Sequence, residues 1–434
     1  MLNVLFNRRH KTCDRFGRRD FIKVGSLGIG SLTLADVLQA RAQETSRGHS
    51  ANNTSVVWLW LGGGATQIET FDPKMSAPAE YRSTTGEVAT SLPGITFGGT
   101  FPKLARIADR MAIVRSFAHT NSGHGGGTHY MMTGFDNRTI DNGGQPSRPS
   151  IGSTMARIRG SNHPISGVPT YVRLGAIGSD GPSYLGPAYS PFDPRGDALR
   201  NMQLSVKQDR LDDRLALLHK LDRINQQIDQ TGAMEGLTRF EQQALTLVMG
   251  DAPKAFDLKR EDPRIVERYG KGLGEQMLQA RRLCQSGCGF VTISFGGWDM
   301  HTGVKSGVER IGPQLDHAVS TFIEDLEHHG MSDSVLLVIA GEFGRTPRVN
   351  SQAGRDHWAP LSPLALAGGG LRMGQVVGES AAKADVPKTT PITPQDLLAT
   401  VFKVLRIDQN RYFLNAAGRP SRLVEAGNPI RELV

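Results

Sequence analysis

The feature of this chain that most limits its fold is a series of short, unbroken apolar runs, each followed by a polar segment that is often rich in glycine. The first run, residues 56–61, ends at three consecutive glycines. An unbroken run, in contrast to an alternation of apolar and polar residues, is typical of a strand buried on both faces of a sheet. Further runs of this kind occupy residues 111–114, 171–174, 290–295, 334–340 and 364–367.

Amphipathic helices are predicted in the segments between these strands. Apolar side chains recur every three or four residues over 203–230 and 304–329, which is the spacing of one helical face. A shorter helix is predicted from Thr393-Pro394 to Leu405, because threonine caps a helix start and proline fits its first turn. Strands that alternate with helices predict an α/β fold with a mainly parallel central sheet.

Polar residues that follow the apolar runs are the candidate site residues, because ligands of parallel sheets gather at the carboxyl ends of the strands. Four such loops supply them. They carry Glu69 and Asp72; His119, His124 and His129; Asp299 and His301; and Glu342, Arg345, Arg355 and His357.

Carboxylates and imidazoles are the ligands of zinc, manganese and iron, and glycines allow the sharp turns that aim them. A bound divalent ion polarises a phosphoryl or sulfuryl oxygen, or generates hydroxide near neutral pH. Arg345 and Arg355 are candidates to hold an anionic group in bidentate fashion. Simpler roles compete for each residue: loop ties for Glu69 and Asp72, an ion pair between Glu342 and Arg345, and structural hydrogen bonds for single histidines. The joint occurrence at strand ends favours a site.

The segment before residue 43 has the features of a twin-arginine export signal. Paired arginines precede an apolar pair and a lysine, and a short, weakly apolar stretch then leads to small residues at the positions a signal peptidase recognises. The residues that carry the pattern are Arg18, Arg19, Phe21, Ala40 and Ala42. The alternative is an amphipathic N-terminal helix with an incidental arginine pair. We expect a signal at 1–42, a polar linker at 43–54, one α/β domain at 55–434, and export by the twin-arginine translocase to the periplasm or beyond.

The net charge of the chain depends strongly on this signal. The chain has 50 lysines and arginines and 42 acidic residues, a net charge of +8, but the signal carries eight of the basic and three of the acidic residues. The remainder has 42 basic and 39 acidic residues, a net charge of +3, which is not the balance of a nucleic-acid-binding protein. It also has no apolar run long enough to span a bilayer, so a membrane span in the mature chain is not expected.

Two of the three cysteines, Cys284 and Cys288, lie beyond the signal. In an oxidising compartment they are candidates for a disulfide, although an i, i+4 spacing on one helical face suits a bridge only marginally. Two buried free thiols are the other possibility, and two sulfurs alone do not make a zinc site.

Several motifs together resemble the domain-of-unknown-function family numbered 1501, whose members include exported, sulfatase-like proteins. They are the twin-arginine leader, the Gly-Gly-Gly…Glu-Thr-Phe-Asp-Pro-Lys loop at 62–74, and the segments at 184–192, 297–301, 341–347 and 354–358. The resemblance covers nearly the whole mature chain. It implies an alkaline phosphatase-like α/β fold, with helices on both faces of the sheet, shared with sulfatases, phosphatases and phosphoglycerate mutases.

The resemblance also implies roles for particular residues. Asp299 and His301 look like the middle metal motif of that superfamily, Glu342 stands where its Asp-His pair occurs, and His357 resembles its final histidine. His124 stands where sulfatases have the cysteine or serine that becomes formylglycine, and the first strand is followed by glycines instead of paired aspartates. These departures speak against ordinary formylglycine chemistry.

Two functions of different classes follow. The first is a metal-dependent hydrolase of phosphate or sulfate esters that acts on a small or carbohydrate-borne anion. In it Asp72, Asp299, His301, Glu342 and His357 bind a divalent zinc, manganese or calcium ion, His124 is the central catalytic residue, and Arg345 and Arg355 hold the anion. The second is an exported binding or assembly protein that keeps the fold without the chemistry.

Overall fold

Seven strands form the central sheet of the protein, which we describe from a computed structural model over residues 54–195 and 252–434. The strands are β1 (Ser55–Trp60), β4 (Met111–Val114), β5 (Tyr171–Leu174), β6 (Phe290–Ser294), β7 (Val335–Ala340), β10 (Leu364–Gly368) and β11 (Gln375–Val377). Their order across the sheet is β11-β4-β10-β7-β1-β6-β5. All neighbouring pairs are parallel except those of β10, which runs antiparallel to both β4 and β7.

The central strand β1 shows why its sequence is apolar without interruption. Val57 and Leu59 belong to one hydrophobic core, and Val56, Trp58 and Trp60 belong to a second core on the opposite face of the sheet. Successive side chains of a strand point to opposite faces, so a strand that is covered on both faces needs apolar residues at every position. The α/β class with a mainly parallel sheet is therefore confirmed.

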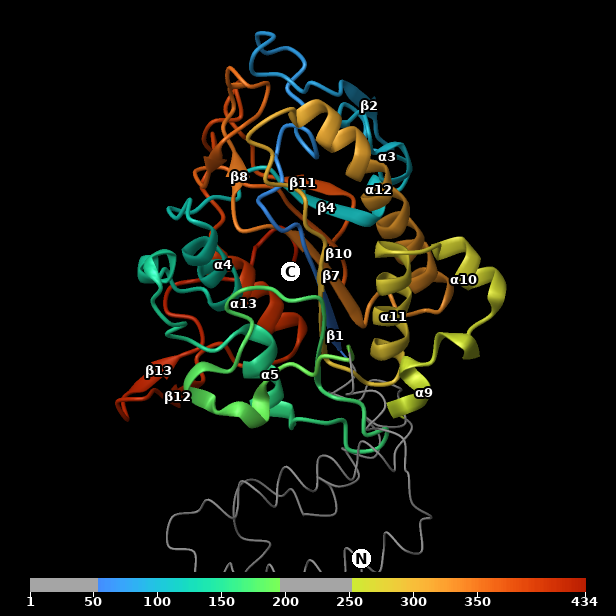
Figure 1. Ribbon diagram of the computed structural model, residues 1–434, viewed down its shortest axis with the longest axis vertical. Helices are drawn as coiled ribbons and strands as arrows, with labels where there is room; N and C mark the ends of the chain where they lie inside the picture. Colours follow the sequence, from blue (N-terminus) through green and yellow to red (C-terminus); the bar gives the residue numbers. More distant parts are fainter. Residues whose placement is uncertain (1–53, 196–251) are drawn as a thin grey trace, which may run out of the picture. The chain divides into compact units, whose positions relative to one another are not determined.

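Helices cover both faces of the sheet (Figure 1). One core is closed by helices α3 (Pro102–Arg106), α9 (Ala252–Phe256), α11 (Leu273–Gln285) and α12 (Val304–His328), with α10 (Pro263–Tyr269) packed on α11 and α12. The other core is closed by α4 (His124–Thr133), α5 (Ile151–Arg159) and α13 (Pro394–Val404). Short 3-10 turns occupy Ala108–Arg110, Arg138–Asn142, Ser183–Leu185, Pro187–Tyr189 and Leu258–Arg260.

Three two-stranded hairpins or bridges lie outside the main sheet. They are β2 (Glu87–Ala89) with β3 (Thr96–Gly98), β8 (Gly344–Arg345) with β9 (His357–Trp358), and β12 (Tyr412–Leu414) with β13 (Pro420–Arg422). The β8–β9 pair fixes the position of His357, because it pairs this residue with Arg345 in the segment after β7.

Two of the predicted helices fall within the described residues, and both are confirmed. The pattern over 304–329 forms α12, and the segment from Thr393 forms α13, whose start has a capping box between Thr393 and Asp396. The predicted helix over 203–230 lies outside the described residues, as do the signal at 1–42 and nearly all of the linker at 43–54. In the described part, no helix is both long enough and apolar enough to cross a bilayer.

The two cysteines are free thiols, and both are buried. Cys284 lies on α11 and Cys288 lies in the turn before β6, outside the helix. Burial raises the pKa of the Cys284 thiol to about 12, which keeps it protonated and unreactive. Of the two possibilities left open by the sequence, the structure shows the buried thiols.

Candidate metal centre and active site

A cluster of histidines and carboxylates lies at the carboxyl ends of β1, β6 and β7, next to the start of α4. The loop after β6 supplies Asp299 and His301, the segment after β7 supplies Glu342, and β9 supplies His357. His124 is the first residue of α4. The ligand atoms of His124, Asp299 and His357 all lie within 4.8 Å of one another. These residues come from positions far apart in the chain, and the parallel sheet brings them together at one edge.

Asp299 is the centre of the cluster. Its Oδ1 lies 3.1 Å from Nε2 of His301 and 3.2 Å from Nε2 of His357, and its Oδ2 lies 3.3 Å from Nε2 of His124. Arg345 donates from Nη2 to the same Oδ1 over 2.5 Å. Partial burial opposes the charged form of this carboxyl, but the hydrogen bond and the positive charge of Arg345 outweigh it and lower the pKa of Asp299 to about 2. Asp299 is therefore an ionised acceptor at neutral pH.

His301 and His357 face each other through their Nε2 atoms, which are 3.1 Å apart. The other nitrogen of each ring is already used: Nδ1 of His301 donates to Asp356 Oδ1 over 2.6 Å, and Nδ1 of His357 donates to the carbonyl oxygen of Ser122 over 3.0 Å. Carboxylate and carbonyl oxygens only accept, so both Nδ1 atoms carry the proton. In the neutral rings both Nε2 atoms are then bare, and two lone pairs point at each other.

A second proton on one of these rings is the way to relieve that contact without a cation. Burial lowers the pKa of His357, and the nearby guanidinium of Arg345 lowers it further. The double protonation of His357 is thus disfavoured. A cation between the Nε2 atoms and Asp299 Oδ1 satisfies all three lone pairs. The three distances of 3.1, 3.1 and 3.2 Å are close to the edge of a tetrahedral site with metal–nitrogen bonds of about 2.0–2.1 Å, which is about 3.3 Å.

Glu342 and His124 form a pair beside this triangle. His124 Nδ1 donates to Glu342 Oε1 over 2.8 Å, and the backbone N–H of Gly63 donates to the same oxygen over 2.8 Å. Glu342 is only 3 % exposed, and its Oε2 is buried without a hydrogen-bond partner among the described residues. The hydrogen bond with Glu342 raises the pKa of His124. This geometry directs Nε2 of His124 toward Asp299 and leaves the imidazole half accessible to solvent.

Arg345 does not point into open space as an anion-binding group would. Its guanidinium is 1 % exposed and donates to the carbonyl oxygens of Gly63, Gly64 and Arg355 as well as to Asp299. It fixes the glycine loop after β1 against Asp299. The anion-holding role predicted for Arg345 therefore has no support in this geometry, and a positioning role replaces it.

Arg355 and Asp72 are not brought to the cluster. Arg355 is fully buried and donates to Glu69 and to the carbonyl oxygens of Arg82, Thr346 and Pro347, so it too has a structural surrounding. The carboxylate of Asp72 contacts Lys74 at 3.2 Å and Arg115 at 3.4 Å. The predicted ligand role of Asp72 and the predicted anion-binding role of Arg355 are both corrected by these contacts.

Of the three histidines in the segment before and within α4, the structure places His124 alone in the cluster. His119 and His129 are buried, and burial lowers the pKa of each to about 4. Nδ1 of His119 accepts from the backbone N–H of Asn121, and Nε2 of His129 contacts Ser147 Oγ. Both are neutral, structural histidines, which is the simpler role that the sequence left open for them.

Asp356 precedes His357 in the chain, but its carboxylate orients His301, while Asn350 Nδ2 donates to it. The contact with His301 lowers the pKa of Asp356. The carbonyl of Ser122 has no side-chain signal at all and was not foreseeable.

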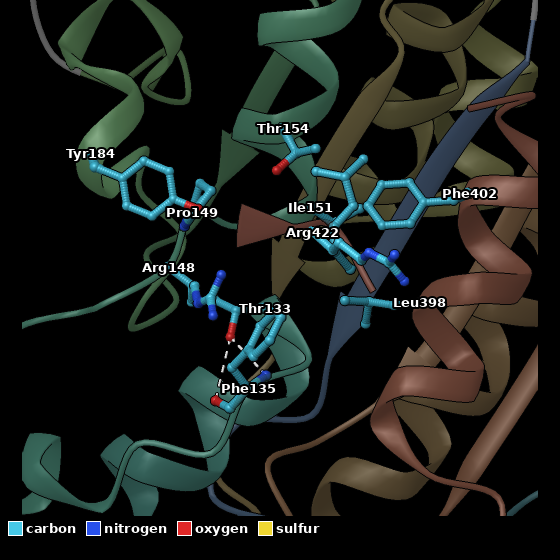
Figure 2. A pocket seen from close by; sticks show the side chains of 11 residues that line it. Thr133, Phe135, Arg148, Pro149, Ile151, Thr154, Tyr184, Leu398, Phe402 and Arg422 are labelled. Atoms are coloured by element: carbon cyan, nitrogen blue, oxygen red, sulfur yellow. Dashed lines mark hydrogen bonds between the residues drawn. The ribbon is translucent and has the colours of Figure 1, made fainter. Parts of the chain in front are cut away.

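A separate narrow cavity lies between α4, α5 and α13 (Figure 2). Arg148 and Arg422 reach it from opposite sides, among apolar side chains that include Ile151 and Phe402. Its described lining residues include none of the histidine cluster and no histidine or carboxylate. We therefore place the candidate active site at the cluster and not at this cavity.

The fold and the cluster together define a class: α/β proteins with a histidine and carboxylate centre at the carboxyl edge of a mainly parallel sheet. Within that class the chain belongs to the family described as protein of unknown function (DUF1501), whose model matches residues 53–434. The family resemblance seen in the sequence motifs is thus confirmed. A comparison with curated protein sequences finds no match.

Among solved structures, the chain is similar to the sulfatase PsFucS1 from Pseudoalteromonas sp., with 11 % identity, a TM-score of 0.39, and coverage of 86 % of this chain and 70 % of that one. It is similar to an alkaline phosphatase from the Antarctic bacterium TAB5, with 10 % identity, a TM-score of 0.35, and coverage of 82 % and 98 %. A third similar structure is the lipoteichoic acid synthase LtaP from Listeria monocytogenes, with 9 % identity, a TM-score of 0.36, and coverage of 82 % and 73 %.

Proposed function

We propose that the protein is a metal-dependent hydrolase of sulfate or phosphate esters. One observation carries the proposal: the Nε2 atoms of His301 and His357 face each other at 3.1 Å, with Asp299 Oδ1 at 3.1 and 3.2 Å from them. Two imidazole nitrogens and a carboxylate oxygen that converge in this way are a donor set that suits a divalent cation.

The donor set fits a divalent transition metal. Asp299, His301 and His357 would hold it, which matches the two-histidine, one-carboxylate composition common for catalytic zinc. Asp356 and the carbonyl of Ser122 fix the two rings through Nδ1, as the outer partners of metal-bound histidines do. When bound, such an ion polarises an ester oxygen and lowers the pKa of water.

His124 and Glu342 supply proton transfer in this proposal. Glu342 is held by Gly63 and orients His124 through Nδ1, so Nε2 of His124 is free to donate or accept a proton next to Asp299. Glu342 is in this account the orienting group of His124 instead of a direct metal ligand. Its Oε2 is buried and has no hydrogen-bond partner among the described residues.

Arg345 and Arg355 are not available to bind an anionic substrate. The guanidinium groups of both arginines donate to backbone carbonyl oxygens and to carboxylates. The positive charge that binds the sulfate or phosphate group would thus come from the cation and from His124. We retain a small or carbohydrate-borne anion as the substrate class.

Metal analysis of matched variants tests this function. Purified protein is treated with a chelator and titrated by calorimetry with zinc, manganese and calcium, and each loaded form is screened against sulfate and phosphate esters. We expect saturable binding of one of these metals, ester hydrolysis that depends on it, and loss of both in His301→Ala and His357→Ala. His328→Ala, which removes an exposed histidine at the end of α12, is the control that should bind normally. Binding without hydrolysis would favour the non-catalytic binding protein, and no binding at all would refute the metal centre.

We also propose that the protein reaches the periplasm or the exterior through the twin-arginine translocase, on the strength of the Arg18-Arg19 motif and the alanines at 40 and 42. Changing Arg18 and Arg19 to lysine should trap the protein inside the cell. The matched control changes the neighbouring pair Arg8 and Arg9 to lysine and should leave export intact. Equal export of both double variants would contradict this route.

A further inference from the structure

The Glu-Thr-Phe-Asp-Pro-Lys segment at the end of the loop after β1 does not contribute to the histidine cluster. Glu69 is bound by Ser83, Thr84, Thr85 and Arg355, and so serves to tie the loop. Asp72 and Lys74 lead instead to a different part of the same sheet edge. This part contains a cavity of about 560 Å³ at the carboxyl ends of β4 and β11. We call it the β4–β11 cavity.

The cavity has a charged floor with an excess of positive charge. Lys74 and Arg115 line it, and both contact Asp72, at 3.2 and 3.4 Å, a carboxylate that also accepts a hydrogen bond from Ser380 Oγ. The two cationic side chains are 18 % and 16 % exposed, so they are largely withdrawn from water. One carboxylate thus faces two cations.

The rim does not neutralise this excess. Glu379 and Lys388 line the cavity as an exposed ion pair, with Nζ and Oε2 2.6 Å apart, and together they add no net charge. Among the described residues, the three cationic side chains that line the β4–β11 cavity face one lining carboxylate, Glu379, and Asp72 beside it, which leaves one positive charge in excess. An excess of positive charge on largely buried side chains is costly, and an anion that enters the cavity would balance it.

The two floor cations differ in how freely they can bind a ligand. Arg115 donates from Nε and Nη2 to the carbonyl oxygen of Phe71, and from Nη2 to that of Thr96, so its guanidinium is fixed. Lys74 has three donor hydrogens, and its contacts are Asp72 and a long one of 3.5 Å to the carbonyl of Ser380. Lys74 is therefore the cation that has a donor hydrogen available for a ligand. Its backbone has a left-handed φ of 50°.

The remaining walls are apolar. Ile95, Val376 and Ala382 line the cavity beside the charged groups. Its volume is in the range of sites that hold small organic ligands and is larger than a single oxyanion requires. We propose that the β4–β11 cavity binds a small organic molecule that carries one anionic group, with the anion on Lys74 and Arg115 and its apolar body against these walls.

This site is distinct from the histidine cluster, because the two share none of the described lining residues. They are joined through one loop: the carbonyl oxygens of its glycines at 63 and 64 accept from Arg345 at the cluster, and its Lys74 lines the cavity. The proposal does not depend on metal binding or on hydrolysis. Either the anion site or the proposed function can therefore be refuted while the other stands.

Calorimetry on chelator-treated protein at constant ionic strength tests the proposal. The probes are benzenesulfonate, which has both the anion and an apolar body, inorganic sulfate and phosphate, which have the anion alone, and benzenesulfonamide, which has the same shape without the charge. We expect saturable binding of benzenesulfonate, weaker binding of sulfate or phosphate, and no binding of the sulfonamide. Saturable binding of the sulfonamide would overturn the ionic basis of the proposal, and binding of none of the anions would overturn the site.

Matched variants then locate the binding. Lys74→Gln should weaken benzenesulfonate about tenfold or more, the usual effect of losing one charge-assisted hydrogen bond. Lys383→Gln, which removes an exposed lysine that stacks on Tyr81 outside the cavity, should bind as the wild type does. If Lys74→Gln binds normally, or if His301→Ala abolishes binding, the anion lies elsewhere and the proposal is wrong.

Discussion

At the scale of single residues, the position of a proton decides what the cluster can bind. Nδ1 of His301 and Nδ1 of His357 each donate to an oxygen acceptor, so in the neutral rings both Nε2 atoms are bare. The two acceptors are Asp356 and the carbonyl of Ser122. The chemistry of the centre thus depends on groups that contact no ligand themselves.

Asp356→Asn tests this dependence. An amide can present its NH₂ to Nδ1 and so permit the other tautomer, with the proton on Nε2, where the cation would be. We expect metal affinity to fall about 10- to 100-fold, with little change in the free energy of unfolding, since Asp356 is half exposed. Asp356→Glu, which keeps the carboxylate, should restore part of the affinity. Equal metal affinity of wild type and Asp356→Asn, measured by calorimetry, would contradict the role.

A glycine shapes the same centre from the opposite side. Gly63 has a φ of +104°, and a Cβ there would lie 2.5 Å from the backbone nitrogen of Asp299. Gly86 also has a positive φ, +79°, but a Cβ there would meet nothing within 4 Å. Gly86→Ala thus measures the backbone cost alone, which is about 1 kcal/mol.

Gly63→Ala should be destabilising by more than Gly86→Ala, by about 1–3 kcal/mol in addition, because the clash adds to the backbone cost. It should also weaken metal binding, since Asp299 must move. Urea unfolding of both variants measures the difference. Equal losses of stability in the two variants would show that the close approach of the loop to Asp299 is wrong.

At the scale of elements, the strands that can be predicted from the sequence are those that are buried in the same way along their whole length. The strands β1, β4 and β7 are covered on both faces, so each appears in the sequence as an unbroken apolar run. The direction of β10 was not predictable, because a buried strand has the same apolar sequence whichever way it runs. The amphipathic pattern of α12 and the cap of α13 are local signals and were read correctly.

The cap of α13 gives a prediction at this scale. Thr393 Oγ1 accepts from the N–H of Asp396, and Asp396 Oδ2 accepts from the N–H of Thr393. Thr393→Ala should cost about 1 kcal/mol of unfolding free energy, because it leaves an N–H of the first turn without its acceptor. Thr390→Ala, at an exposed position just before the helix, should cost much less in the same urea titration. A cost at position 393 no larger than that at 390 would argue against the capping box.

The candidate site was predicted by residue type and only in part by role. His124, Asp299, His301, Glu342 and His357 meet because parallel strands end at one edge, which the sequence pattern anticipates. Whether a polar residue after a strand turns toward that edge depends on contacts made elsewhere. Asp72 turns to Lys74 and Arg115, and Arg355 is held by Glu69, which lies 286 residues away in the chain. Pairings of that range leave no trace in a single sequence.

At the scale of the whole molecule, buried neutral histidines make stability depend on pH. His119 and His129 have pKa values of about 4 in the folded protein, compared with about 6.5 in the unfolded chain. Between these values the unfolded state binds more protons than the folded state. Their contribution is fully present above about pH 6.5 and is lost as the pH falls toward 4.

Urea unfolding at a series of pH values measures this effect. We expect the wild type to lose up to about 3 kcal/mol per buried histidine between pH 7 and pH 4, since one pKa unit corresponds to about 1.4 kcal/mol. His119→Asn should be less stable at pH 7 but should lose less on acidification. A variant whose stability falls as steeply as that of the wild type would show that His119 is not the titrating group.

A cation held between His301, His357 and Asp299 is the centre of the proposed function, and anomalous diffraction from crystals soaked in zinc observes it directly. We expect one strong peak about 2.0–2.2 Å from Nε2 of both histidines and from Oδ1 of Asp299, with Nδ1 of His301 still donating to Asp356. A crystal that binds no zinc there, or binds it through other residues while the two Nε2 atoms remain in contact, would contradict the central claim.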